Sequence, residues 1–111
     1  MSDLRRTFAA LRCETRRALI EKLALGPASV GELARPFAMS GPAISQHLNV
    51  LEEAGLVRKT VQGQRRIMSL EVGPLREAQR WLGRQQRFWE AQVESLHDHL
   101  HKKRRTRRRV K

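Results

Sequence analysis

The segment 29–56, SVGELARPFAMSGPAISQHLNVLEEAGL, constrains the fold more than any other part of the chain. Ser29 is followed three residues later by Glu32, which is the spacing of a capping box at the start of a helix. Pro36 lies near the end of the same helical pattern, where it would kink or terminate the last turn. The segment therefore begins with a predicted short helix over 29–37 that closes in a turn.

A second helix is predicted over 40–54. Ser40 suits the N-cap, and Pro42 falls in the first turn, where a missing backbone N–H costs nothing. Gly55 suits the left-handed residue that commonly follows the last turn of a helix. Two short helices joined by a tight turn are the form of a helix-turn-helix.

The two faces of the 40–54 helix differ in chemistry. At about 100° per residue, one stripe is apolar and consists of Ile44, Leu48 and Leu51. The opposite face carries mostly short side chains, those of Pro42, Ser45, Gln46, Asn49 and Glu53. In a DNA major groove, Gln and Asn pair with adenine, Ser pairs with several bases, and an apolar side chain can meet a thymine methyl. This face predicts contact with base edges, although a plain bundle helix or a protein-binding helix would also fit.

The period of the sequence changes to two in 57–70, which predicts a β-hairpin with Gly63 at its tip. Four basic residues lie on or beside this hairpin: Arg58, Lys59, Arg65 and Arg66. Such a wing can reach phosphates or the minor groove next to the helix, with Arg65 and Arg66 as the favoured contacts. The alternative is a solvated edge whose charges merely prevent strand pairing.

Three further helices are predicted, over 3–12, 14–25 and 73–101. The first and the last carry apolar stripes longer than a chain of 111 residues can cover by itself. We therefore expect a second copy of the chain to pack on them. The expected interface residues are Leu4, Phe8, Leu11, Leu75, Trp81, Leu82, Phe88, Trp89, Val93 and Leu96. A ligand cage is the alternative role for the aromatic members of this set.

The charge of the chain points to a polyanionic partner. Lys and Arg number 23 against 11 acidic residues, which gives a net charge of +12. Eight of these basic residues lie in 102–111, so the rest of the chain is only moderately basic. We expect 102–111 to be a disordered basic tail that adds non-specific attraction to phosphates.

Three sequence words give the chain a family resemblance: ETRRALIEKL, SVGELA and SGPAISQHLNVLEEAGLV. Through them, residues 3–101 resemble the ArsR/SmtB family of bacterial winged-helix repressors. The resemblance implies a homodimer that binds a palindromic operator, with the 40–54 helix in the major groove and the hairpin as its wing. It also implies that the first and last helices form the dimer interface. Repression would follow from blocking a promoter, often the regulator's own.

The candidate DNA contacts combine the helix face with the wing. They are Ser40, Gly41, Pro42, Ser45, Gln46, His47, Asn49, Arg58, Lys59, Gln64, Arg65 and Arg66. His47 lies at the edge between the buried stripe and the outer face. For this side chain, a structural or phosphate contact is a better interpretation than base reading.

No metal site or cofactor is expected. The metal sensors of the family carry a cysteine pair in the third helix, whereas this chain has no cysteine there. His97, Asp98, His99 and His101 are crowded together, and the pair His97 and His101 lacks an evident third ligand. Cys13 is the single cysteine, so redox sensing has no resolving partner in the chain. An enzyme is not expected either, because no nucleophile and base spacing or phosphate-binding loop is present.

The sequence thus predicts a mainly α fold with a small β-hairpin wing, in the order α-α-α-α-β-β-α. One winged helix-turn-helix domain would occupy 1–101, followed by the tail 102–111. Its predicted partners are double-stranded DNA and a second copy of itself. No membrane association is expected, and the predicted location is the cytoplasm, at the nucleoid. Two alternatives remain: a repressor that responds to an effector or a metal, and a non-specific nucleic-acid-binding or structural protein driven by the tail.

Overall fold

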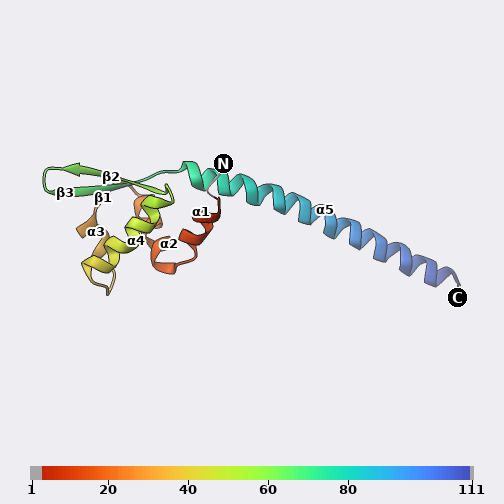
Figure 1. The fold of residues 1–111 in the computed structure, drawn as a ribbon. Helices are drawn as coiled ribbons and strands as arrows, with labels where there is room; N and C mark the ends of the chain where they lie inside the picture. The colour runs from red at the N-terminus through yellow and green to blue at the C-terminus, as the bar shows by residue number, and fades with distance from the viewer. Residues whose placement is uncertain (1–3, 111) are drawn as a thin grey trace. The chain divides into compact units, whose positions relative to one another are not determined.

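The computed structural model describes the backbone of residues 4–110 and the side chains of residues 4–102. Its contacts divide the chain into two compact units, Met1–Ala78 and Gln79–Lys111. The elements follow one another as α1 (Leu4–Leu11), α2 (Glu14–Leu23), β1 (Ala28–Ser29), α3 (Val30–Ala34), α4 (Gly41–Glu53), β2 (Val57–Gln62), β3 (Arg65–Leu70) and α5 (Gly73–Val110) (Figure 1). The predicted winged helix-turn-helix is confirmed, and the predicted order α-α-α-α-β-β-α is found with one addition, the short strand β1 between α2 and α3.

The capping box at the start of α3 is formed as predicted. The Ser29 hydroxyl accepts a hydrogen bond from the backbone N–H of Glu32 at 3.2 Å, and the Glu32 carboxylate accepts one from the backbone N–H of Ser29 at 3.2 Å. The helix ends at Ala34, earlier than the predicted limit at residue 37. Pro36 follows directly after the C-cap residue Arg35 and ends the helix as predicted, because it has no N–H to continue the helical hydrogen bonds.

Helix α4 matches its prediction at both ends. Ser40 is the N-cap, and its hydroxyl accepts from the backbone N–H of Ala43 at 3.2 Å. At the other end, Gly55 has a φ of +74°, and its N–H donates to the Glu52 carbonyl at 2.9 Å. The N–H of Leu56 donates to the carbonyl of Leu51, also at 2.9 Å. These two bonds make a Schellman motif, which satisfies carbonyls that the helix itself leaves open.

The hairpin is confirmed, but it belongs to a three-stranded antiparallel sheet in the order β1-β3-β2 (Figure 1). In the added pairing, Ala28 lies opposite Met68 and Ser29 opposite Ile67. The sequence did not predict β1, because a strand of two residues is too short to show alternation. The same extended backbone of Ser29 serves both the strand pairing and the N-cap of α3.

The core of the first unit joins the helices to the sheet. Its largest fully buried apolar side chains come from α2, α3, α4, β3 and the turn after α4: Leu19, Leu33, Ile44, Leu51, Leu56 and Met68. The predicted stripe of α4 is thus confirmed, since Ile44, Leu48 and Leu51 are all at most 2% exposed. Burial of this stripe turns the opposite face of α4 outward.

Helix α5 continues to Val110, beyond the predicted limit at His101. The backbone is helical over 102–110, the segment in which the sequence analysis expected the basic tail. No Gly or Pro interrupts this stretch, and Lys and Arg have good helix propensities. Within the described residues, no helix is both long enough and apolar enough to cross a membrane.

Replacing Leu51 by Ala should lower the free energy of unfolding by about 2 to 5 kcal/mol, because it removes a fully buried side chain and leaves a cavity. Urea unfolding followed by circular dichroism measures the change. Leu25, which is 90% exposed after the end of α2, provides the matched control, and Leu25→Ala should change stability by less than about 0.5 kcal/mol. Equal losses in the two variants would contradict this description of the core.

Candidate nucleic-acid interface

The outward face of α4 presents the residues predicted to read bases. Pro42, Gln46 and Asn49 are exposed, while Ser45 and His47 are half-buried at its sides. Gly41 is also exposed at the first turn. Ser40 is exposed as well, but its hydroxyl is already used as the N-cap acceptor. The α4 residues predicted from sequence therefore gather on one side of a helix whose other side is fixed in the core.

The wing carries the second group of predicted residues. Arg58, Lys59, Gln64, Arg65 and Arg66 are all exposed. Gln62 lies opposite Arg65, so Gly63 and Gln64 form a two-residue turn between the strands. The φ of Gly63 is +63°, a backbone conformation that glycine adopts without strain.

Carboxylates of the same chain meet three of the four basic side chains of the wing. Arg58 Nε lies 2.8 Å from Glu71 Oε1, and Lys59 Nζ lies 4.0 Å from Glu52 Oε1. These pairs are exposed or half-exposed, so each contributes little to stability. They nevertheless mean that a phosphate approaching Arg58 or Lys59 has a competing carboxylate.

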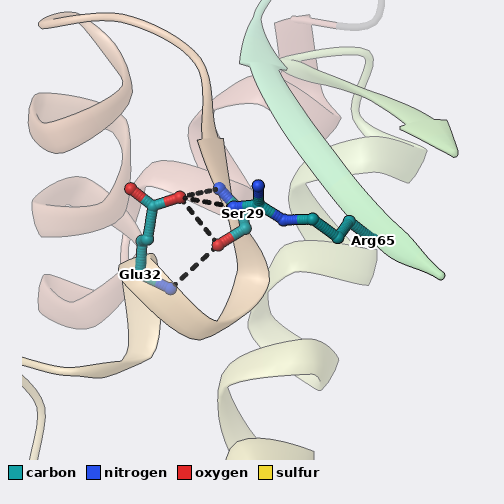
Figure 2. Close-up of polar contacts among 3 residues, drawn as sticks. All are labelled: Ser29, Glu32 and Arg65. Atoms are coloured by element: carbon teal, nitrogen blue, oxygen red, sulfur yellow. Dashed lines mark hydrogen bonds and ion pairs between the residues drawn. The ribbon is translucent and has the colours of Figure 1, made fainter. Parts of the chain in front are cut away.

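The third pair joins the wing to the start of α3. Arg65 Nη2 lies 3.2 Å from Oε1 of Glu32, the same oxygen that accepts from the backbone N–H and hydroxyl of Ser29 (Figure 2). The hydrogen bonds from the Ser29 hydroxyl and backbone N–H, together with the positive charges of Arg65 and Arg35, hold the pKa of Glu32 below its ordinary value. The sequence favoured Arg65 as a phosphate contact. In the structure, Arg65 also links β3 to the capping box through its ion pair with Glu32.

Arg66 is the wing cation with the least competition. Among the side chains of residues 4–102, it is the one of the four that has no carboxylate within ion-pair distance. It lies opposite Val61 in the hairpin and is exposed. Of the wing residues predicted to contact phosphate, Arg66 is the most available to do so.

The structure gives His47 a specific partner. Its Nδ1 lies 3.4 Å from Nη1 of Arg16, a residue of α2 that was not among the predicted site residues. Glu32, Glu52 and Glu71 were also absent from that prediction, although they contact the wing. No local sequence signal could have identified Arg16 or Glu32 as partners, because 31 residues separate Arg16 from His47 and 33 separate Glu32 from Arg65.

The residues expected at a dimer interface fall into three groups by exposure. Leu11 and Leu75 are half-buried and pack partly against the core of the first unit, and Leu4 is also half-buried. Phe8 and Trp81 are each 36% exposed. The remaining apolar side chains lie on α5 and are 51% to 63% exposed: Leu82, Phe88, Trp89, Val93 and Leu96.

The histidine cluster of α5 forms a ring pair. The rings of His97 and His101 stack edge to face with centroids 4.2 Å apart. Among the described residues, no group of three or more His, Cys, Asp or Glu side chains could hold a metal ion. Cys13 is the N-cap of α2 without a side-chain capping bond, and nearby backbone N–H groups, that of Arg16 first, lower the pKa of its thiol.

Comparison with known proteins agrees with this geometry. Residues 13–59 match the sequence pattern of the arsR family of bacterial regulatory proteins. Transcriptional repressor SdpR of Bacillus subtilis is 33% identical over 75 residues, which are 68% of this chain and 83% of that repressor. The chain belongs to the ArsR family of DNA-binding transcriptional regulators.

Two further transcriptional regulators resemble the chain. The HTH-type transcriptional regulator Rv2034 of Mycobacterium tuberculosis is 52% identical over 66 residues, which are 60% of this chain and 62% of that regulator. The match thus spans somewhat less than two thirds of the regulator's length. The crystal structure of the ArsR family transcriptional regulator RHA00566 has a TM-score of 0.75 and 41% identity, covering 78% of this chain and 96% of that one.

The lowered pKa of Glu32 predicts a pH dependence of stability. Because the folded-state pKa is lower than the unfolded one, Glu32 stabilises the fold above its ordinary pKa of 4.5, and this contribution is lost as pH falls through the folded-state value. Urea unfolding of the wild type and of Glu32→Gln should show the variant less stable at pH 7 and the difference shrinking below about pH 4.5. Glu21→Gln, an exposed change on α2, serves as the control. A difference between wild type and Glu32→Gln that stays constant from pH 7 to pH 3 would contradict the assignment.

Proposed function

We propose that the protein is a homodimeric transcriptional repressor that binds a palindromic operator and acts in the cytoplasm. The observation that carries the proposal is the outward face of α4. Its exposed Gln46 and Asn49 stand on a helix that the core holds from behind and that a basic wing flanks. The ArsR membership and the similarity to a named repressor support the same function.

The side chains of α4 and of the wing are suited to different roles in DNA binding. Gln46 and Asn49 can each pair with an adenine edge in the major groove, and Pro42 can meet a thymine methyl. Wing cations contact phosphates and supply affinity that does not depend on sequence, with Arg66 the most available. Ser45 and His47 are half-buried at the sides of α4, and we infer contacts from them to the DNA backbone or to nearby bases.

The dimer is supported by the apolar side chains that α5 exposes. Residues from Leu82 to Leu100 show six large apolar side chains that are at least 50% exposed: Leu82, Phe88, Trp89, Val93, Leu96 and Leu100. Exposure of this many in one helix is typical of an interface rather than of a solvated surface. In a two-fold dimer, the two α4 helices would enter successive major grooves about 34 to 36 Å apart.

The rival function is a nucleic-acid-binding protein without sequence preference, driven by the basic residues of 102–111. Competition binding separates the two. A palindromic promoter fragment that the protein binds serves as the labelled operator. The same fragment without label should displace it at concentrations at least about 1,000-fold lower than random duplex does, which is the lower end of typical operator specificity. Equal competition by both DNAs would refute the repressor. Adding candidate metals or ligands to the same assay tests separately whether an effector changes the affinity for the operator.

Gln46→Ala should weaken operator binding by about 1 to 3 kcal/mol and leave random-duplex binding nearly unchanged, because the amide pairs with a base edge. Fluorescence anisotropy with both DNAs measures the two losses. Arg66→Ala is the contrasting variant, since loss of a phosphate contact should weaken both DNAs alike and reduce the salt slope by about 1. An equal loss on both DNAs for Gln46→Ala would mean that α4 does not read bases.

Trp89→Asp should produce monomers, because it places a charge in the middle of the exposed apolar stripe of α5. Sedimentation velocity at micromolar concentration measures the change in mass. Ala91→Asp adds the same charge at an exposed position about 160° around the helix, so it should leave the dimer intact. A Trp89→Asp dimer, or equal dissociation of both variants, would refute this placement of the interface.

A further inference from the structure

The side chain of Arg16 connects the end of α1 to α4. Its Nε donates to the Ala10 carbonyl at 2.7 Å, and its Nη2 donates to the Ala9 carbonyl at 3.3 Å. Its Nη1 lies 3.4 Å from Nδ1 of His47 on α4. One guanidinium therefore binds two backbone carbonyls and one imidazole at the same time.

The position of this guanidinium is set by the fold. The carbonyls of Ala9 and Ala10 lie in the last turn of α1, where the regular helical pattern of hydrogen bonds ends. The carbonyl of Ala9 also accepts from the backbone N–H of Arg12 at 3.3 Å. The negative end of the helix dipole favours a cation there as well. Arg16 is half-buried, which restricts its other rotamers. Its contact with His47 is thus preformed before any DNA arrives.

In a neutral His47 ring, this contact favours one of the two tautomers. A guanidinium has only donors, so Nδ1 must be the acceptor in this bond. A neutral imidazole has one N–H, and that proton is then on Nε2. Nε2 is on the other side of the ring from Nδ1, and among the described side chains no other hydrogen bond to His47 is found. This leaves one N–H donor for a ligand.

We propose that Arg16 is a positioning residue for operator binding: it holds the His47 ring so that Nε2–H donates to a phosphate oxygen of the DNA backbone. The proposal rests on the proposed function of α4. His47 directly follows Gln46 and is half-buried at the edge of the outward face. A side chain in that place meets the backbone beside the groove, and its bond fixes the register in which Gln46 reads a base.

A neutral donor leaves a recognisable signature in the salt dependence. A cation that meets a phosphate releases counterions, so its loss lowers the slope of log K against log salt by about 0.9. An uncharged imidazole N–H adds affinity without this release. Loss of the His47 contact should therefore lower operator affinity at every salt concentration and leave the slope unchanged, whereas a direct Arg16 contact to phosphate would change the slope.

The matched variants are Arg16→Gln and Arg17→Gln. Arg17 also supports the end of α1, since its Nη1 donates to the carbonyls of Leu11 at 2.7 Å and Arg12 at 3.1 Å. Both variants remove one positive charge and one support of the same helix end. Of the two residues, Arg16 is the one that contacts His47 in the described structure. Any loss of stability or of general electrostatic attraction should therefore affect the two variants alike.

Nitrogen NMR of the imidazole in the free, full-length protein is the first measurement. The wild type and Arg17→Gln should show the proton of His47 on Nε2, and Arg16→Gln should show a mixture of the two tautomers. Operator binding is the second measurement. Arg16→Gln should bind about tenfold more weakly, the effect of one hydrogen bond to a charged acceptor, with an unchanged salt slope. Arg17→Gln should lose less than about twofold.

His47→Gln completes the test, because its amide keeps an N–H donor and has no tautomer for Arg16 to select. In this background, Arg16→Gln should cost no more than Arg17→Gln does. Three results would overturn the proposal: a wild-type His47 with its proton on Nδ1, equal losses for the two arginine variants, or a reduced salt slope in Arg16→Gln. The NMR result needs no DNA, so it stands apart from a failure of the wild type to prefer its operator, which would refute the proposed function instead.

Discussion

Burial of one stripe of α4 is the constraint on which the rest of the structure depends. Ile44, Leu48 and Leu51 are essentially inaccessible to water, and each such side chain contributes about 1.5 to 3 kcal/mol of hydrophobic stabilisation. Rotation of α4 about its axis would expose all three at once. The orientation of the outward face, with Gln46 and Asn49, is therefore fixed by apolar contacts that never meet DNA. The polar side chains of the face proposed to read bases therefore need no support from one another.

Much of this arrangement could be predicted from the sequence because its determinants are local. The capping box of α3 and the Schellman motif at the end of α4 depend on residues at most five positions apart, and both are formed as their residue types indicate. The same holds for the turn at Gly63, whose positive φ suits glycine. The apolar period of α4 predicted its buried face correctly, since the spacing of apolar residues indicates both the helix and the side of it that is buried.

The parts that the sequence did not predict depend on contacts between distant residues. Strand β1 has two residues, and only its pairing with β3 identifies it. Arg65 meets Glu32, and Arg16 meets His47, across separations that leave no pattern in the chain. Helix α3 ends at Ala34, just before the Pro36 that the sequence already indicated as its end. Helix α5 continues past His101 into a basic segment with good helix propensity, which the hydrophobic pattern does not register.

The internal ion pairs of the wing alter how its charge should be understood. Four basic side chains suggest a strong phosphate clamp, but Glu71, Glu52 and Glu32 each pair with one of them. Exposed pairs of this kind are worth about 0.2 to 1 kcal/mol, so a phosphate can displace a carboxylate at small cost. The displaced carboxylate still remains near the DNA and repels it, which lowers the net gain per contact. Affinity for DNA of any sequence is then smaller than the number of basic residues implies. If α4 reads bases as proposed, a larger share of operator affinity consequently falls to its exposed Gln46 and Asn49.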